Sequence, residues 1–341
     1  MKTLVTGGGG FLGRYIVEKL AARGDSVRVL GRNPYPPLQS VGVETVQADI
    51  RNRNAVVNAC RDVDVVFHVA SIVKLWGAWE EFRGINVDGT TNVIEGCKAH
   101  GVPRLVYTST PSVVFGRGDL CNIDETYPYP ERYDSFYPAS KAMAERAVLS
   151  ANGGNGLSTV VLRPHLIWGP RDTHLVPAVI LRARKHQLMI VGDGRAIVDF
   201  TYVENAADAH LLAGDLLSAG STVAGRAYFI SQDEPVLLWE FVNLILERMH
   251  IRRATRKIPL PVARAVGATL EIVHSALHLE AEPRVTRFLA IQLARSHYFN
   301  ISRAKQDLGY TPRVPTAQGL DRLIEYMEQT PPSSHRGVQI H

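Results

Sequence analysis

Short apolar runs alternate with amphipathic stretches along the first half of the chain. The runs are rich in β-branched residues and occupy residues 4–5, 27–30, 43–48, 63–67, 105–107 and 159–162. Between them, residues 11–23, 80–100 and 137–151 repeat their apolar positions with the period of a helix. Buried strands separated by helices are typical of a parallel sheet with helices on both faces. Right-handed crossovers then predict an α/β fold built on a doubly wound, parallel Rossmann sheet.

The pattern becomes irregular after Pro164. Helices are predicted at 175–186, 203–217, 237–249, 261–279 and 316–327, mixed with short strands such as 227–231. We interpret 1–165 as a nucleotide-binding domain, to which residues from about 195–215 also return. We interpret 166–330 as a smaller, mostly helical substrate lobe. Substrate would bind between them, beyond the carboxyl ends of the strands. The polar, Pro/Ser-rich residues 331–341 predict a disordered tail.

A glycine-rich loop, Thr6-Gly-Gly-Gly-Gly-Phe-Leu-Gly13, lies between the first predicted strand and the first predicted helix. Glycine lets the chain turn sharply and bring backbone N–H groups onto a pyrophosphate at a helix N-terminus. A glycine string alone is a weak signal, but this one has the strand before it and the helix after it. The loop therefore predicts a dinucleotide cofactor, with contacts from Gly7, Gly10, Phe11, Leu12 and Gly13.

The end of the second strand bears on the choice of cofactor. An acidic residue there would bind the ribose 2′-hydroxyl of NAD, but this chain has Gly31, Arg32 and Asn33. Arg32 suits a 2′-phosphate, so we favour NADP(H) over NAD(H); a solvent-facing loop arginine is the alternative. Asp49 and Ile50 follow the third strand and are placed to meet the adenine, although Asp49 could equally be an exposed loop residue.

Tyr137 and Lys141 are one helical turn apart in the predicted helix 137–151. A free phenol has a pKa of about 10 and is a poor proton shuttle at neutral pH. A lysine ammonium at i+4 favours the phenolate and is expected to lower that pKa. Upstream, the fifth strand ends in a run of hydroxyls. One of them, Ser109 or Thr110, is expected to hydrogen-bond the reacting oxygen, and we favour Thr110. Together these groups predict hydride transfer between an alcohol and a ketone.

At this point the chain resembles the extended short-chain dehydrogenase/reductase family, from residue 6 to about residue 327. The shared motifs are Thr6-Gly-x-x-Gly-x-x-Gly13, Asp49-Ile50, His68-Val-Ala-Ser71, Asn86-Val-x-Gly-Thr90, Tyr107-Thr-Ser-Thr110, Tyr137-x-x-x-Lys141, Leu162-Arg-Pro164, Asp199-Phe-Thr-Tyr-Val203 and Leu308-Gly-Tyr-x-Pro312. The resemblance implies that Tyr137 is the general acid/base, and that Lys141 binds the nicotinamide ribose and tunes the tyrosine. It also implies cofactor contacts at Ala70 and Pro164, and a homodimer formed through the helices that carry Asn86 and Tyr137.

Within that family the chain is most similar to the 3β-hydroxysteroid dehydrogenase branch. Residues 162–172 resemble those of sterol-4-carboxylate 3-dehydrogenases and of bacterial 2-alkyl-3-oxoalkanoate reductases, and residues 75–79 resemble the latter. The resemblance implies a bulky hydrophobic substrate with a carboxylate one carbon from the reacting carbon. We predict substrate contacts from Trp76, His165 and Trp168. His165, Arg171 and Lys74 are candidate carboxylate partners, although each also suits a structural or surface role.

Two other functions stay open at this stage. The same scaffold hosts nucleotide-sugar epimerases, so the fold alone does not settle the reaction. A non-enzymatic NADP-binding sensor is the second alternative. Such proteins often lose the tyrosine or the lysine, and this chain has both Tyr137 and Lys141.

The amino-acid composition limits which partners and which cellular compartment are expected. The net charge is +5, but Lys and Arg are scattered, which favours an anionic cofactor over nucleic acid. Cys60, Cys97 and Cys121 lack metal-ligand spacing and indicate a reducing, cytoplasmic setting without a bound metal. We expect no secretory signal and no transmembrane span. The amphipathic residues 259–279 leave membrane-surface binding open beside an ordinary lid or core helix.

Overall fold

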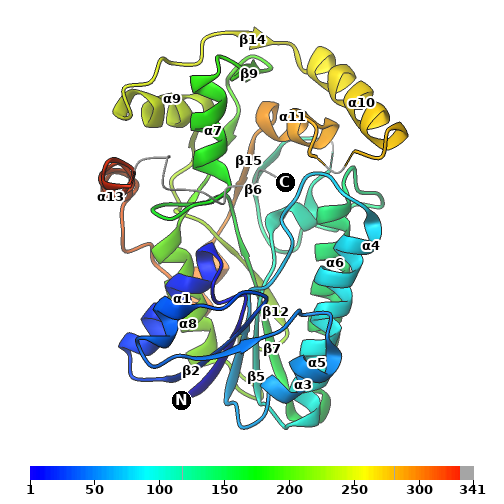
Figure 1. Cartoon of the computed structure of the whole chain (residues 1–341), viewed down its shortest axis with the longest axis vertical. Coiled ribbons are helices and arrows are strands. Elements are labelled where there is room, and N and C mark those ends of the chain that lie inside the picture. The colour runs from blue at the N-terminus through cyan, green and yellow to red at the C-terminus, as the bar shows by residue number, and fades with distance from the viewer. Residues whose placement is uncertain (117, 280, 331–341) are drawn as a thin grey trace.

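A seven-stranded parallel sheet organises the molecule (Figure 1). The computed structural model describes residues 1–116, 118–279 and 281–330. The strand order is β12-β7-β5-β4-β1-β2-β3. The strands are β1 (Lys2–Thr6), β2 (Ser26–Gly31), β3 (Glu44–Gln47), β4 (Val65–His68), β5 (Arg104–Thr108), β7 (Ser158–Pro164) and β12 (Arg226–Ile230). The order reverses between β1 and β4, so ligands are expected beyond the carboxyl ends of these two strands. The predicted doubly wound parallel sheet is confirmed.

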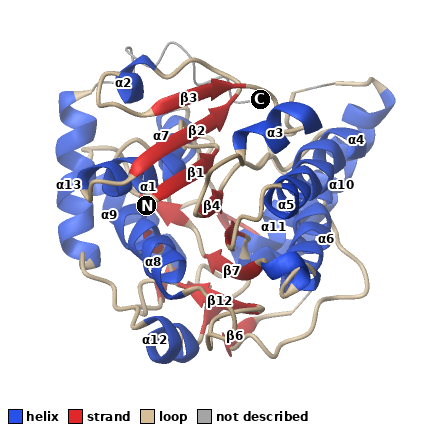
Figure 2. Cartoon of the chain, turned by 90° about the horizontal axis from the view of Figure 1, so that it is seen from below, coloured by secondary structure: helices blue, strands red, loops and turns tan. Residues whose placement is uncertain are grey.

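Helices cover both faces of this sheet (Figures 1 and 2). One face carries α1 (Phe11–Ala22) and α8 (Val203–Leu216); the other carries α3 (Arg53–Ala59), α5 (Gly89–Ala99) and α6 (Phe136–Ser150). In α1, Leu12, Ile16 and Leu20 recur at every fourth residue and are buried against the sheet. In α8, Gly214 lies so close to β4 that an added Cβ would be 2.7 Å from the Phe67 ring.

The rest of the described chain forms the upper lobe and its connections (Figure 1). The remaining helices are α2 (Pro36–Gln39), α4 (Trp79–Phe82), α7 (Leu175–Arg184), α9 (Leu238–Arg248), α10 (Leu260–Ala276), α11 (Arg287–Ala294), α12 (Ser302–Leu308) and α13 (Thr316–Gln329). Of these, α2 and α12 pack on the core of the large sheet. A π-helical stretch, Arg83–Asp88, leads into α5, and 3₁₀ turns occur at Pro111–Val114 and Gly154–Gly156.

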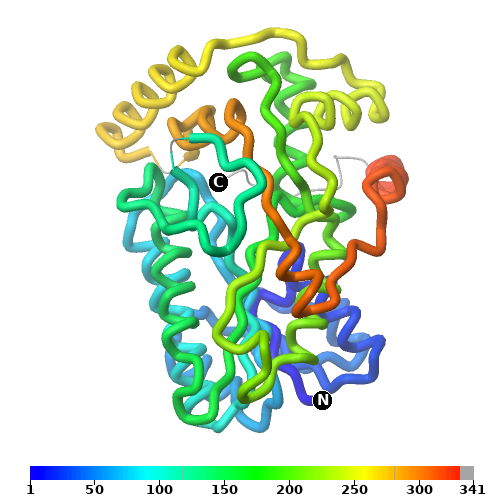
Figure 3. Tube along the Cα trace, turned by 180° about the vertical axis from the view of Figure 1, so that it is seen from behind, coloured from blue at the N-terminus to red at the C-terminus, as the bar shows by residue number. Residues whose placement is uncertain are grey.

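Short strands connect distant parts of the chain. They are β6 (Leu120–Ile123), β8 (Ile167–Trp168), β9 (Ile190–Val191), β10 (Ile197–Val198), β11 (Thr201–Tyr202), β13 (Val236–Leu237), β14 (Lys257–Ile258) and β15 (His297–Phe299). Four of them form a sheet in the order β13-β10-β15-β6, which places β6 from the first half of the chain beside β15 near its end (Figure 3). The lobe has its own core, centred on Trp168, Tyr202 and Phe241.

One strand predicted for the upper lobe belongs to the large sheet instead. We expected residues 227–231 in the smaller lobe, but β12 pairs in parallel with β7 at the edge of the main sheet. Tyr228, Phe229 and Ile230 are fully buried there, because helices cover both faces of the sheet. The chain therefore returns to the nucleotide-binding domain at α8 and again at β12. The predicted disordered tail, 331–341, lies outside the described residues. Among the residues described, no helix has the length and apolar character of a membrane span.

Candidate active site

The glycine loop is packed too tightly for side chains. Gly7 has a φ of +70°, in the left-handed region that favours glycine, and its N–H donates to the carbonyl of Leu30. A Cβ on Gly13 would lie 2.2 Å from the Gly7 carbonyl oxygen. Helix α1 starts at Phe11 with Gly10 as its N-cap residue and has no side-chain cap. The first N–H groups of α1 are therefore free to bind phosphate, and the loop fits a dinucleotide.

The residues predicted around the adenosine half take different positions. Arg32 is exposed at the end of β2 and forms no ion pair with a described residue. Tyr35 covers the loop, because a Cβ on Gly9 would fall 1.8 Å from its ring. Asp49 is hydrogen-bonded by Arg51, which lowers the pKa of Asp49 to about 2. Ile50 is buried against Gly89 in α5. Arg32 is therefore available to a phosphate, whereas Asp49 already has a cationic partner.

Two further predicted cofactor contacts lie at the ends of neighbouring strands. Ala70 follows β4 and approaches the loop so closely that a Cβ on Gly7 would be 2.8 Å from its backbone. Pro164 ends β7, opposite Ile230 of β12. Both therefore lie at the carboxyl edge of the sheet, where a nucleotide would extend from the glycine loop towards α6.

Tyr137 lies in the first turn of α6, beside the hydroxyl of Thr110. Burial raises the pKa of Tyr137 to about 12, and the hydrogen bond with Thr110 opposes this rise. The expected lowering of this pKa by Lys141 is therefore wrong for the protein alone. Burial disfavours the phenolate, and the ammonium of Lys141 is engaged elsewhere. Tyr137 is protonated at neutral pH and so is ready to donate a proton.

Lys141 is buried one turn further along α6. Its Nζ donates to the carbonyl oxygen of Thr108 at 2.7 Å and lies 4.3 Å from the centroid of the Tyr107 ring. Burial lowers the pKa of Lys141 to about 7, although Glu145 opposes the change. The side chain is thus held between β5 and α6.

Ser109 and Thr110, the two candidate hydroxyls, are separated by their partners. Ser109 donates to the carboxylate of Glu145, which is fully buried. Glu145 also pairs with Arg163 of β7 and accepts from the Tyr129 hydroxyl at 2.6 Å. Thr110 accepts from the backbone N–H of Ser112 and lies beside Tyr137. Thr110, which the sequence favoured, is therefore the one of the two hydroxyls that lies beside Tyr137.

The buried Glu145–Arg163 pair was not predicted from the sequence, although a signal for it was present. Tyr137, Lys141 and Glu145 recur at every fourth position and so share one face of α6. Asn86 adds a second anchor: its Nδ2 donates to the Ser140 hydroxyl at 2.9 Å, and its Oδ1 accepts from the N–H of Ile72. These contacts fix α6 relative to β5, β7 and the loop after β4.

The predicted substrate residues do not all face open space. Trp168 is fully buried in the core of the upper lobe, where it packs edge-on against Tyr202 and Phe241. His165 is also buried; its Nδ1 bonds Asp199 at 2.5 Å and its Nε2 bonds His297 at 3.1 Å. Trp76 is half-buried and donates from its indole to the carbonyl of Leu279. Of these three side chains, only Trp76 lies near the surface.

The other two candidate carboxylate partners are engaged as well. Arg171 pairs with Glu18 of α1 and stacks on the Tyr15 ring. Lys74 lies 3.1 Å from Glu81. These pairs leave no free cation among the candidates that the sequence suggested.

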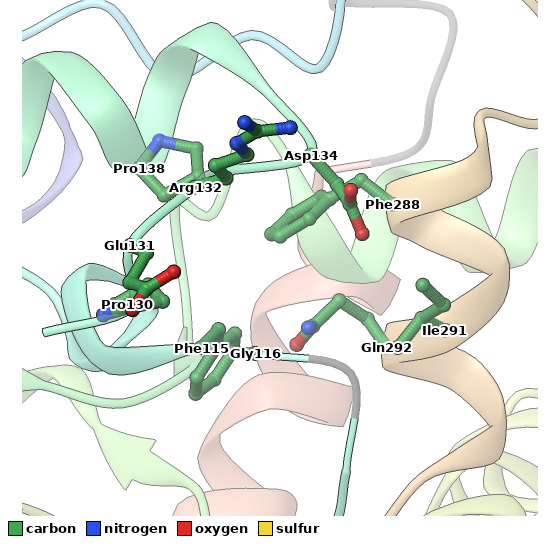
Figure 4. Close-up of a pocket in the computed structure, with 10 residues that line it drawn as sticks. All are labelled: Phe115, Gly116, Pro130, Glu131, Arg132, Asp134, Pro138, Phe288, Ile291 and Gln292. Atoms are coloured by element: carbon green, nitrogen blue, oxygen red, sulfur yellow. The ribbon is translucent and has the colours of Figure 1, made fainter.

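A cavity of about 450 Å³ opens beside the N-terminus of α6 (Figure 4). Its lining residues come from the loop before α6, the first turn of α6, the segment after the hydroxyl run and α11: Phe115, Gly116, Pro130, Glu131, Arg132, Asp134, Pro138, Phe288, Ile291 and Gln292. Arg132 is the cation among them, and it forms no ion pair with a described residue. Phe115, Phe288 and Ile291 supply apolar surface. Glu131 and Asp134 add two carboxylates to the wall, so the cavity combines apolar surface with charges of both signs.

Known proteins resemble this chain over most of its length. Residues 4–262 match the 3-beta hydroxysteroid dehydrogenase/isomerase family. A 2-alkyl-3-oxoalkanoate reductase of Stenotrophomonas maltophilia is 46% identical over 330 residues, covering 95% of this chain and 98% of that protein. The decarboxylating sterol-4-alpha-carboxylate 3-dehydrogenase of Homo sapiens is 36% identical, covering 94% and 87%. The structure of MoeE5 in complex with UDP-glucose and NAD has a TM-score of 0.76 at 25% identity, covering 96% and 99%.

The fold, the glycine loop and these similarities define an NAD(P)-dependent oxidoreductase. The chain belongs to the 3-beta hydroxysteroid dehydrogenase/isomerase family, which confirms the resemblance inferred from its motifs.

Proposed function

We propose that this enzyme reduces the ketone of a 2-alkyl-3-oxo acid to the corresponding 3-hydroxy acid, with NADPH as cofactor. The similarity to a 2-alkyl-3-oxoalkanoate reductase over nearly the full length of both chains is the observation that carries the proposal. A sterol-4-carboxylate substrate is the second candidate, supported by the lower but still extensive similarity to the human dehydrogenase. Both substrates join a reacting carbon, a nearby carboxylate and a bulky hydrocarbon.

The resting state of the site supports reduction. The bound nicotinamide nucleotide would supply the hydride. Tyr137 is protonated, so its hydroxyl can donate a proton to the oxygen of the ketone as negative charge develops there. Thr110 adds a second hydrogen bond to that oxygen, and Lys141 would bind the ribose and supply positive charge beneath it. We therefore assign the proton transfer to Tyr137, with Thr110 and Lys141 as its supporting groups.

Within the cavity, Arg132 offers a position for the carboxylate of an acid substrate. We propose that Arg132 binds the carboxylate while Phe115, Phe288 and Ile291 contact the alkyl chains. Arg132 suits this role because no described carboxylate pairs with it, whereas Arg171 and Lys74 have their own partners. A guanidinium at the rim could hold a planar carboxylate through two parallel hydrogen bonds.

The preference for NADPH rests on Arg32. No carboxylate lies at the end of β2 to bind a ribose 2′-hydroxyl, and the exposed guanidinium of Arg32 is free to pair with a 2′-phosphate. Tyr35, which covers Gly9, is close enough to the same end of the loop to contact the adenosine half.

A substrate comparison tests the proposal. Turnover would be measured in the oxidative direction with NADP⁺ and either a 2-alkyl-3-hydroxy acid or a 3β-hydroxysterol 4-carboxylate. We expect the hydroxy acid to have at least a tenfold higher kcat/KM. In Arg132→Gln, KM should rise for the acid but not for the matching alcohol without a carboxylate. A preference for the sterol would favour the second candidate, and turnover of neither would refute both.

A further inference from the structure

Helix α10 lies at the end of the upper lobe farthest from the N-terminus of the chain (Figure 1). Its inner face rests on the start of α11. Ala263 and Gly267 are the buried residues of that face, and a Cβ on Gly267 would be 2.8 Å from the backbone nitrogen of Arg287. Glu271 strengthens this contact by pairing with the same arginine. The helix is thus fixed to the lobe by one face only.

The opposite face of α10 is apolar and exposed along its whole length. It consists of positions spaced by three and four residues, which we call the outer stripe: Val262, Ala265, Val266, Thr269, Ile272, Val273, Ala276 and Leu277. Every one is exposed; Ile272 reaches 68% and Leu277 64%. None is charged. A continuous apolar face of this kind is uncommon on a protein surface and marks a contact with something outside the described chain.

Exposed basic residues precede this stripe along the chain. Arg252 and Arg256 are exposed in the segment that leads through β14 into α10. Arg264 is exposed in the first turns of the helix, but it stands two residues from both Val262 and Val266 and so lies on the other side of the helix from the stripe. No described carboxylate lies within ion-pair distance of these three, whereas the neighbouring Arg253 pairs with Glu240 and Glu247. Apolar surface bordered by free arginines is complementary to a lipid surface that contains anionic head groups.

A second copy of the chain is a poorer match for the stripe. Helix α10 has 17 residues and is therefore about 25 Å long, so its outer face would bury only a few hundred Å² against another helix. A stable protein interface usually buries about 800 Å² on each partner. A lipid surface has no such minimum, because it accepts any apolar face that reaches the acyl boundary.

We propose that α10 docks the enzyme on lipid surfaces that contain anionic lipid. The outer stripe lies at the boundary between head groups and acyl chains, and Arg252 and Arg256 contact the anionic head groups. This docking goes beyond the proposed reaction and is independent of it. It would also bring lipid close to the cavity, because α11, on which α10 rests, supplies Phe288 and Ile291 to the cavity wall.

Vesicle flotation tests the docking without any turnover. The full-length protein would be mixed with vesicles of phosphatidylcholine alone, or of phosphatidylcholine containing about one third phosphatidylglycerol. We expect flotation with the anionic vesicles at low salt, and less with phosphatidylcholine alone or at high salt. Ile272→Asp and Leu277→Asp should each lower binding about tenfold or more, since each replaces a large exposed apolar side chain, which would insert into the lipid surface, with a charge.

The controls separate this proposal from its rivals. Val41→Asp changes an equally exposed valine, 63% accessible, in the loop before β3, and should float like the wild type. Turnover of a water-soluble substrate should be unchanged in all variants, which shows that they fold. Absence of flotation, or normal flotation of Ile272→Asp, would overturn the proposal. Light scattering that shows a dimer which Ile272→Asp converts to a monomer would assign the stripe to a second copy instead.

Discussion

Tyr137 is the residue on which the proposed chemistry depends. Its hydroxyl is protonated and lies beside Thr110. Tyr137→Phe removes only that oxygen, so the fold and cofactor binding should survive while kcat falls by roughly two to four orders of magnitude. Tyr133→Phe is the matched control, because its hydroxyl donates to the carbonyl of Val113. Near-normal turnover by Tyr137→Phe would indicate that a hydroxyl in the run 109–112, and not Tyr137, donates the proton.

Lys141 should make the stability of the folded protein depend on pH. Its folded-state pKa of about 7 lies below the ordinary lysine value of about 10.4. Below pH 7 the ammonium is charged in both the folded and unfolded states. Burying this charge then lowers the free energy of unfolding by its largest amount. The cost shrinks as pH rises from 7 and disappears above the unfolded value. Lys141→Met removes this charge, so its melting temperature should exceed that of the wild type by more at about pH 6 than at about pH 9.5. A difference in melting temperature that does not vary with pH would contradict this account.

Arg32 decides the cofactor in this account. Removing one charge-assisted contact to a phosphate costs about 1.5–3 kcal/mol, which corresponds to about a tenfold change or more in affinity. Arg32→Ala should therefore raise KM for NADPH about tenfold and leave KM for NADH unchanged. Arg53→Ala, at another exposed arginine that pairs with Glu95 in α5, is the control. Wild-type enzyme that prefers NADH would show that Arg32 is only a surface residue.

Sequence spacing predicted which reactive groups meet, but not their electrostatics. Tyr137 and Lys141 share a helix face by simple periodicity, and the end of a neighbouring strand brings Thr110 to them. Whether burial or a neighbouring charge dominates a pKa depends on the surroundings of each group in three dimensions, and here burial dominates at Tyr137. Arg132 was missed because its importance comes from a cavity shared with α11, which lies more than 150 residues further along the chain.

At the scale of elements, Glu145 of α6 and Arg163 of β7 form a buried pair beneath the reactive hydroxyls. Glu145→Ala would leave the buried guanidinium without its charge partner and should lower the free energy of unfolding by about 3–5 kcal/mol. Glu95→Ala breaks the exposed pair with Arg53 and should cost no more than about 1 kcal/mol. Urea unfolding measures both.

A double variant keeps this test decisive if Glu145→Ala does not fold. Glu145→Leu combined with Arg163→Met removes both charges and should recover most of the lost stability. Equal losses for the buried and exposed pairs would show that the buried pair does not hold α6 against β7.

Elements with local signals were predictable, and elements defined by long-range pairing were not. The glycine loop and the amphipathic α1 are visible in a few adjacent residues. The place of β12 is not, because a five-residue apolar strand fits the edge of either sheet equally well. Only its burial against β7 and α12 assigns it to the large sheet. Two later elements, α8 and β12, therefore belong to the domain that we expected to end at residue 165.

At the scale of the whole molecule, the two lobes place a glycine loop suited to phosphate, a protonated phenol and a cavity with apolar and charged walls around one end of a parallel sheet. This arrangement fits direct hydride transfer to a hydrophobic ketone. Homodimerisation through α5 and α6 stays a prediction, which the molar mass in solution would test.

Transfer of an isotope label tests the central claim most directly. NADPH deuterated at the transferable position of its nicotinamide would be incubated with the enzyme and a 2-alkyl-3-oxo acid, and the product analysed by mass spectrometry and NMR. We predict a 2-alkyl-3-hydroxy acid with one deuterium at C3, formed by the wild type and nearly absent with Tyr137→Phe. A hydroxy acid without deuterium at C3, or no product from this substrate, would contradict the account.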